Sequence, residues 1–325
     1  MGWTVVIIVS IVAACPAGAQ EIFFLGGAMQ DTETNDRSYS WQIEYREGLA
    51  EHFAYSLSYL NEGHTPNHHR DGHSVQIWTR ANVFDRRLSL AAGFGPFYFF
   101  DTMAAPAGTS HYNDHGWGGI LSFAATWHGE SRWLVQLRTN VIETSESIDT
   151  VSAVFGVGYQ LEAPLSAAPL TQPTPRRRRT MNNEMTVFFG RTIVNSFGSE
   201  PADAGSIEYR RCLRPSVEWT ITWLYEGKNS VIARNGLITQ LWAAKAFLED
   251  DRLALGIGFG PYHGIDRYRD PHSSSAHDRF LSGVLTLTGS YGFHPHWGIR
   301  ISWNRTITDY NRDTDVILAG IGYRF

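Results

Sequence analysis

The chain has 325 residues and a formal net charge of −5, a length that suits two domains. The modest negative charge argues against a nucleic-acid partner, which needs a basic surface. After the first twenty residues, no stretch approaches the roughly 18 uninterrupted apolar residues of a membrane helix. Aromatic residues are abundant, with 11 Trp, 14 Tyr and 18 Phe. Together these features are typical of strands that face lipid on one side only.

The first segment reads as an export signal. Residues 1–20 carry no charged side chain, contain an apolar run, and end in small residues up to Ala19. This pattern predicts a signal peptide, with the mature chain beginning near Gln20. The alternative is a lipoprotein signal in which Cys15 is lipidated, which Pro16 directly after it disfavours.

An internal repeat defines the domain organisation. A shift of 164 or 165 residues brings the two halves of the chain into register. The matched segments include Ile43-Glu44-Tyr45-Arg46 with Ile207-Glu208-Tyr209-Arg210, Tyr59-Leu60-Asn61-Glu62-Gly63 with Trp223-Leu224-Tyr225-Glu226-Gly227, Gly93-Phe94-Gly95-Pro96-Phe97 with Gly258-Phe259-Gly260-Pro261-Tyr262, and Asp149-Thr150 with Asp313-Thr314. The repeat predicts two modules, at about 21–161 and 185–325.

Each module contains eight alternating segments of about the length of a tilted membrane strand. In the first module we expect strands near 21–31, 38–47, 52–62, 72–82, 87–101, 116–128, 132–143 and 149–161. In the second we expect them near 185–195, 204–211, 216–226, 236–247, 252–266, 280–292, 296–307 and 313–325. The alternation is plain from Phe53 to Tyr59, where large side chains share one face and small ones share the other.

Residues 162–184 separate the modules and are rich in Pro, followed by a run of Arg from Arg176 to Arg179. This composition predicts an extended, solvated linker. The fold class is therefore all-β, with two tandem eight-stranded antiparallel transmembrane barrels. One sixteen-stranded barrel is the alternative. We favour two barrels because the linker is longer than a turn needs and eight strands close around a side-chain-filled interior.

The last strand carries outward-facing apolar positions and closes on an aromatic residue, Phe325. This ending resembles the terminal assembly signal of bacterial outer-membrane barrels. Connections alternate between short turns, such as 129–131, and longer loops, such as 101–115. We expect the short turns on the periplasmic side and the long loops outside.

Polar residues shared by the modules on the non-aromatic face are expected to line the barrel interiors. These are Glu44, Arg46, Gln76, Trp78 and Asn140 in the first module, and Glu208, Arg210, Gln240, Trp242 and Asn304 in the second. Buried charges need partners, so we interpret the set as a network that fills the lumen. The alternative is that Glu44 or Glu208 is a catalytic carboxylate, but no convincing nucleophile and base pair lies nearby.

Interior glycines have a packing role in this scheme. We expect Gly93, Gly95, Gly256, Gly258 and Gly260 to leave room for large side chains from opposing strands, and no helix follows that would make them a nucleotide-binding loop.

Histidines cluster in the predicted outer loops. They are His64, His68, His69, His73, His111 and His115 in the first module, and His272 and His277 in the second. Their spacing matches no closed metal site, so we predict solvated loop residues and no metal or cofactor.

Each module resembles small outer-membrane barrels of the lipid A deacylase-like kind. The residues that carry the resemblance are the glycine-rich fifth strand and the endings Ser302-Trp303-Asn304-Arg305, Asp313-Thr314-Asp315 and Gly322-Tyr323-Arg324-Phe325. The resemblance implies a Ser, a His and a Glu that hydrolyse an acyl chain of lipid A. The His-x-Ser-Asn pattern falls at 300–305, where Ser302 and Asn304 are present without the His.

Because Ser302 has no obvious general base, the activity does not transfer. The chain is predicted to be a non-catalytic protein of the cell outer membrane, with a structural, surface-binding or lipid-binding role. The alternatives are a sixteen-stranded pore and a lipid A-modifying acyl hydrolase. The expected partners are outer-membrane lipid, including lipopolysaccharide, and the barrel assembly machinery.

Overall fold

The computed structural model describes residues 20–85, 87–104, 111–161, 182–247, 252–267 and 278–325. The expected signal peptide and most of the expected linker lie outside the described residues. No helix in the described part of the chain is long and apolar enough to cross a membrane.

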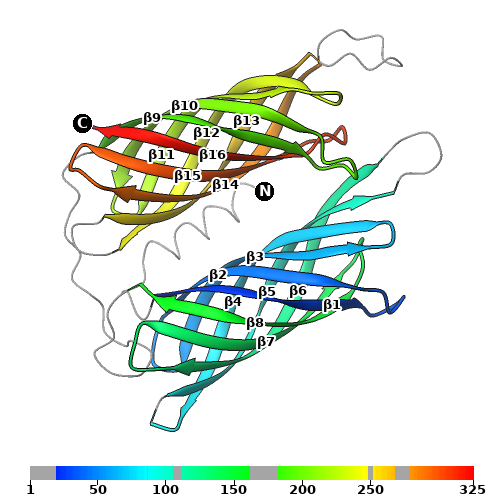
Figure 1. Ribbon diagram of the computed structural model, residues 1–325, viewed down its shortest axis with the longest axis vertical. Coiled ribbons are helices and arrows are strands. Elements are labelled where there is room, and N and C mark those ends of the chain that lie inside the picture. The colour runs from blue at the N-terminus through cyan, green and yellow to red at the C-terminus, as the bar shows by residue number, and fades with distance from the viewer. Residues whose placement is uncertain (1–19, 86, 105–110, 162–181, 248–251, 268–277) are drawn as a thin grey trace. The chain divides into compact units, whose positions relative to one another are not determined.

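The first module is a closed antiparallel barrel (Figure 1). Its strands are β1 (Gln20–Asp31), β2 (Arg37–Gly48), β3 (Phe53–Thr65), β4 (His68–Val83), β5 (Leu88–Met103), β6 (Tyr112–His128), β7 (Trp133–Thr144) and β8 (Thr150–Gln160). Each strand pairs with its neighbour along the chain, and β8 returns to pair with β1. The module therefore closes on itself.

The second module repeats this arrangement. Its strands are β9 (Asn183–Val194), β10 (Pro201–Arg214), β11 (Val217–Lys228), β12 (Ala233–Phe247), β13 (Leu253–Asp266), β14 (Asp278–Gly292), β15 (Trp297–Ile307) and β16 (Thr314–Arg324). Here β16 pairs with β9. Two eight-stranded barrels are thus confirmed, and the sixteen-stranded alternative is wrong because β8 does not pair with β9.

Closure satisfies the backbone of every strand, and alternation gives each barrel two different faces. Along β7, for example, Val135 and Leu137 are exposed on the outside, whereas Gln136, Arg138 and Asn140 are buried inside. The outward side chains of both barrels are mostly large and apolar, and the inward ones are mostly polar or small. This is the inverse of a soluble barrel, and it suits an apolar surrounding with no water for the backbone to bind.

Each barrel has two distinct ends, named here by their connections. The turn end carries the chain's entry and exit and the turns at 49–52, 84–87 and 129–132 in the first module. The loop end carries the connections at 32–36, 66–67, 104–111 and 145–149. Corresponding connections in the second module follow the same order.

One predicted loop is mostly strand. The hairpin of β3 and β4 continues to the pair Thr65 and His68, so the turn is only Pro66 and Asn67. Asn67 has a φ of 67°, a left-handed conformation that asparagine tolerates in tight turns. His64, His68, His69, His73 and His115 therefore lie on strands and not in loops. His111 precedes β6 and is buried, so the prediction of a solvated residue is wrong there. His272 and His277 lie outside the described residues. Alternation of His with polar residues concealed these strand ends.

Candidate functional site

The interior of the first barrel is organised around one carboxylate. Glu44 on β2 accepts two hydrogen bonds from Arg138 on β7, at 2.8 and 2.6 Å, in a bidentate ion pair across the lumen. Arg46 approaches the same carboxylate at 2.9 Å, and Arg138 also donates to Gln136 at 2.7 and 3.0 Å. All four side chains are buried. The charge of Glu44 is therefore fully compensated within the barrel.

The two guanidinium groups stack on one indole ring, that of Trp78. The Arg46 guanidinium lies 3.9 Å from the ring centre of Trp78, and that of Arg138 lies 4.9 Å away. Trp78 donates from Nε1 to Ser56 Oγ at 2.8 Å. Gly93 faces Trp78 in the neighbouring strand, and a Cβ added there would lie 2.4 Å from the indole. The expectation that this glycine makes room for a large side chain is confirmed.

A chain of neutral hydrogen bonds lies beside the ion pair. Gln76 donates to Ser122, and Ser122 donates to Asn140 at 2.7 Å. Asn140 in turn donates to Ser152 at 3.0 Å and to Gln42 at 3.4 Å. This chain joins β4, β6, β7, β8 and β2 across the lumen, so it connects opposite walls of the barrel.

The second barrel keeps most of these residues but pairs its charges differently. Arg210 donates from Nε to Glu208 at 3.0 Å and from Nη1 to Glu218 at 2.7 Å. Its guanidinium lies 4.0 Å from the ring centre of Trp242. An added Cβ at Gly258 would lie 2.5 Å from that indole, so this glycine makes room for Trp242 as Gly93 does for Trp78. The neutral chain also persists, because Gln240 donates to Thr286 and Thr286 donates to Asn304, both at 2.9 Å.

All ten residues that the sequence singled out thus lie inside the barrels, and the structure brings them together in two equivalent layers. Arg46 contacts both Glu44 and Trp78 in the first barrel, and Arg210 contacts both Glu208 and Trp242 in the second. Gln76 and Asn140, and likewise Gln240 and Asn304, are linked through one hydroxyl residue.

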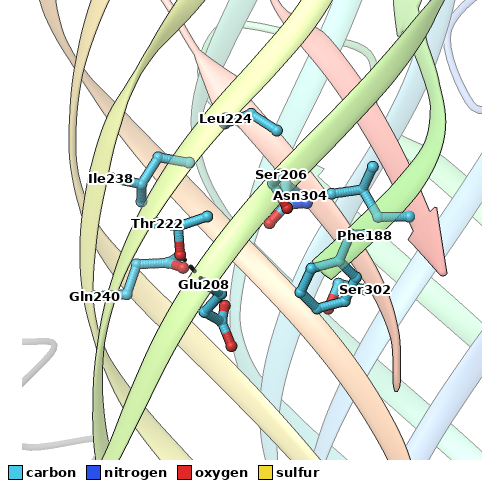
Figure 2. A pocket seen from close by; sticks show the side chains of 10 residues that line it. Phe188, Ser206, Glu208, Thr222, Leu224, Ile238, Gln240, Ser302 and Asn304 are labelled. Atoms are coloured by element: carbon cyan, nitrogen blue, oxygen red, sulfur yellow. Dashed lines mark hydrogen bonds between the residues drawn. The ribbon is translucent and has the colours of Figure 1, made fainter. Parts of the chain in front are cut away.

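The main difference between the layers is the position of Arg138. Its counterpart on β15 is Ser302, because Arg138 pairs with Val154 and Ser302 pairs with Leu318 at the same register. The hydroxyl of Ser302 lies 3.1 Å from that of Thr288 and does not reach Glu208 directly. A small cavity of about 10 Å³ therefore opens beside Glu208 (Figure 2).

In the second barrel, the inward arginine of β15 lies closer to the turn end than Arg138 does on β7 in the first. Arg300, two residues before Ser302, donates to Glu184 at 2.6 Å, and Arg324 donates to the other oxygen of Glu184 at 2.8 Å. In the first barrel the residue equivalent to Arg300 is Gln136. The same strand thus carries an arginine in both barrels, but at levels one inward position apart.

A second buried cluster, which the sequence analysis missed, closes the loop end of each barrel. Arg70 donates from Nε to Glu62 at 2.5 Å, from Nη2 to Thr150 at 2.8 Å, and from Nη1 to the carbonyl oxygen of Ile148. Thr150 donates to Glu62 as well. Strands β3 and β4 are thereby tied to the connection before β8 on the opposite wall.

The second barrel reproduces this cluster with Arg234, Glu226 and Thr314. Arg234 donates to both oxygens of Glu226 at 2.7 and 2.5 Å, to Thr314 at 2.5 Å, and to the carbonyl of Arg312 at 2.9 Å. The repeat shift aligns Arg70 with Arg234, so the signal was present in the sequence. It was hidden because Arg70 lay in what read as an outer loop.

A bulge sets the position of the two glutamates. The ladder between β3 and β4 shifts register between Asn61 and His64, and that between β11 and β12 shifts between Tyr225 and Gly227. Gly63 and Gly227 take φ values of 68° and 83° there. These values favour glycine, and each glycine directly follows the clustered glutamate.

The loop ends differ in the partner of one aspartate. In the first barrel, Asp101 lies 2.7 Å from His68 Nδ1 and accepts a hydrogen bond from Ser147 at 2.8 Å. In the second, the equivalent Asp266 accepts from Arg312 at 3.2 Å. One contact depends on a titratable imidazole and the other on a permanent cation. The hydrogen bond to Asp101 raises the pKa of His68 above its ordinary value of 6.5.

The residues implied by the deacylase resemblance lie in the lumen. Ser302 is buried on an inward position, and its hydroxyl partner is Thr288. Asn304 is occupied by Thr286 and the carbonyl of Val316. In the part of the chain that the structure describes, no three His, Cys, Asp or Glu side chains come together in a way that could hold a metal ion.

The comparison with protein families finds no match, and neither does the comparison with curated proteins. Among solved structures, the chain is similar to the N-terminal β-barrel domain of Pseudomonas aeruginosa OprF, with 10% identity, a TM-score of 0.34, and coverage of 44% of this chain and 98% of that one. It is also similar to Ail, the attachment invasion locus protein of Yersinia pestis, with 10% identity, a TM-score of 0.33, and coverage of 45% and 98%.

A third similar structure is the Ralstonia pickettii toluene transporter TbuX, with 10% identity, a TM-score of 0.26, and coverage of 97% of this chain and 92% of that one. The chain's own fold defines its class: a tandem all-β protein of two closed antiparallel barrels with apolar exteriors and polar, filled interiors.

Proposed function

We propose that this chain is an integral outer-membrane protein whose two barrels are sealed, non-catalytic bodies with a structural or surface-binding role. The observation that carries the proposal is the inversion of polarity in both barrels. Large apolar side chains such as Phe94, Leu137, Ile221 and Ile317 are exposed on the outside, while charged side chains are paired inside. Such a surface is stable in lipid and would aggregate in water.

The filled lumens support a sealed barrel over a channel. In the first barrel the layer of Glu44 and Arg138 crosses the lumen, and an apolar cluster of Leu60, Phe97, Phe99, Ile120 and Ile142 fills the space toward the loop end. The second barrel has an apolar cluster that includes Phe188, Leu224, Tyr262 and Val316. Eight strands enclose an interior that side chains fill, so we expect neither barrel to conduct ions.

The position of Ser302 supports the non-catalytic assignment. An acyl chain of lipid A would approach from the outer, lipid-facing surface, whereas Ser302 faces the lumen and is 4% exposed. Its hydrogen-bond partner is a threonine hydroxyl and not an imidazole. A serine in this setting has no base to take its proton.

Surface binding is the role that the loop ends suit best. They project beyond the apolar surface, and the first barrel presents aromatic and imidazole rings there, with His64 and His69 3.9 Å apart between ring centres. Tyr98 and Trp117 lie 4.8 Å apart just below. We expect outer-membrane lipid, including lipopolysaccharide, to contact these aromatic and imidazole rings. We expect the barrel assembly machinery to insert the chain.

Three measurements test the proposal on the full-length protein. Cell fractionation should recover it in the outer membrane, planar bilayers should show no stable channel, and mass spectrometry of lipid A should show no lost acyl chain. Recovery as a soluble periplasmic protein would overturn the location, and a large, stable conductance would overturn the sealed barrels. Deacylation that Ser302→Ala abolishes would overturn the non-catalytic role.

A further inference from the structure

We propose that the cavity beside Glu208 in the second barrel is a hydration site, which holds one ordered water where the first barrel places the guanidinium of Arg138. Five polar side chains line this cavity together with Glu208. They are Ser206, Thr222, Gln240, Ser302 and Asn304, and they come from four different strands around the lumen (Figure 2).

The cavity results from two truncations at one level of the barrel. Where the first barrel has Arg138 and Gln42, the second has Ser302 and Ser206, and both pairs occupy equivalent register positions. Nearby enlargements recover part of the lost volume, since Leu25 becomes Phe188, Val154 becomes Leu318 and Ser74 becomes Ile238 at matching positions. The space that remains is about 10 Å³, which is roughly what one water molecule needs.

The polar groups at the cavity call for an occupant. The hydroxyl of Ser206 is buried, at 4% exposure, and has no hydrogen-bond partner among the described residues. In the first barrel the longer Gln42 at this position accepts a hydrogen bond from Asn140. Glu208 accepts from Arg210 and, at 3.4 Å, from Thr222, which leaves acceptor capacity on the carboxylate that faces the cavity. A water between Ser206 and Glu208 would satisfy both groups.

Size and charge favour water over a cation. A guanidinium or alkylammonium group is larger than the cavity. The charge of Glu208 is already balanced at 3.0 Å by Arg210. An apolar layer that includes Leu224, Ile238 and Leu318 covers the cavity toward the loop end. A trapped water therefore exchanges slowly with solvent.

The test compares buried water in the full-length protein and in three variants. A high-resolution crystal structure should show one density peak within hydrogen-bond distance of both Ser206 Oγ and the Glu208 carboxylate. Magnetic relaxation dispersion of water oxygen in the folded, detergent-solubilised protein counts slowly exchanging internal waters. Ser302→Leu, which fills the cavity, should lower this count by one and abolish the peak. Ser206→Ala, which removes one partner without filling the space, should reduce the occupancy of the peak.

Thr139→Leu, on the outward face of the first barrel, is the matched control and should leave the count unchanged. An empty cavity in the wild-type crystal, or equal counts in wild type and Ser302→Leu, would overturn the proposal. A peak that gains anomalous scattering after rubidium is added would identify a cation and overturn it as well. If Ser302→Leu does not fold, the wild-type crystal and Ser206→Ala still decide the question. The site is independent of the proposed membrane role, because all readouts concern the lumen of the folded chain.

Discussion

Arg138 and Ser302 occupy the same position in the two barrels, and this difference changes how the central buried glutamate of each barrel is paired. Arg138 reaches across the lumen to form a bidentate ion pair with Glu44, whereas Ser302 stops at Thr288 and leaves a cavity beside Glu208. The second barrel compensates with Glu218, which gives Arg210 a second carboxylate, and with Arg300, which pairs with Glu184. The two barrels thus pair their buried charges differently.

Arg138→Ala should be strongly destabilising. The substitution leaves Glu44 buried with only Arg46 nearby, so the free energy of unfolding should fall by roughly 3–5 kcal/mol. Equilibrium urea unfolding of the folded full-length protein measures the change. The double variant Glu44→Gln with Arg138→Met should be no more stable, because Arg46, which lies 2.9 Å from the Glu44 carboxylate, would then stay buried without it.

The matched control for Arg138→Ala is Arg191→Ala. Arg191 forms an exposed ion pair with Asp203 at 3.6 Å, and such pairs contribute about 0–1 kcal/mol. Equal effects of the two substitutions would contradict the central role of the Glu44 ion pair.

Gly93→Ala should destabilise the first barrel through a steric clash. The new methyl group would lie 2.4 Å from the indole of Trp78, and overpacking of this kind costs about 1–3 kcal/mol. Gly119→Ala is the control, because a Cβ at Gly119 has no atom within 4 Å. Urea midpoints should separate the two variants, and a similar midpoint for both would show that the indole moves aside easily.

Arg70→Lys should loosen the loop end of the first barrel although it keeps the charge. A lysine cannot reproduce the fork that joins Glu62, Thr150 and the carbonyl of Ile148. Loss of these charge-assisted bonds should cost about 1.5–3 kcal/mol. Amide hydrogen exchange should accelerate in the connection 145–149. Unchanged protection there would mean that the cluster does not tie β8 to the hairpin of β3 and β4.

The contact between His68 and Asp101 should make the tip of the β3–β4 hairpin sensitive to pH. On β4 the outward apolar residues begin at Val75, and His68 precedes them at the tip of the hairpin. The side chain faces Asp101 and Asp31, which favour its charged form, and Arg70, which opposes it. Because the folded pKa lies above 6.5, the stabilisation is fully present below pH 6.5 and is lost as pH rises through the raised value.

Hydrogen exchange at 64–69, corrected for intrinsic rates, should therefore show protection that declines as pH rises through that range. His68→Gln should give a profile without this decline. In the second barrel, Asp266 pairs with Arg312 and not with an imidazole, so the connection 308–313 serves as an internal control. A decline of equal size there would argue against His68 as its origin.

The sequence by itself determined those features of the protein that depend only on local patterns. The period-two alternation, the repeat shift and the even spacing of turns are local, and they determined the two modules, sixteen strands and the inward face on which Glu44, Trp78 and Asn140 lie. Alternation suffices for this because adjacent side chains on a strand point to opposite faces.

Closure and partner choice required the tertiary structure. The sequence did not decide between two barrels and one large barrel. The pairing of β8 with β1 joins residues more than a hundred positions apart, and it leaves no local signature. The same reason hid the pairing of Glu44 with Arg138 and the cluster of Arg70. Which buried charge meets which is decided by barrel register, since only the closed ring sets the distance across the lumen.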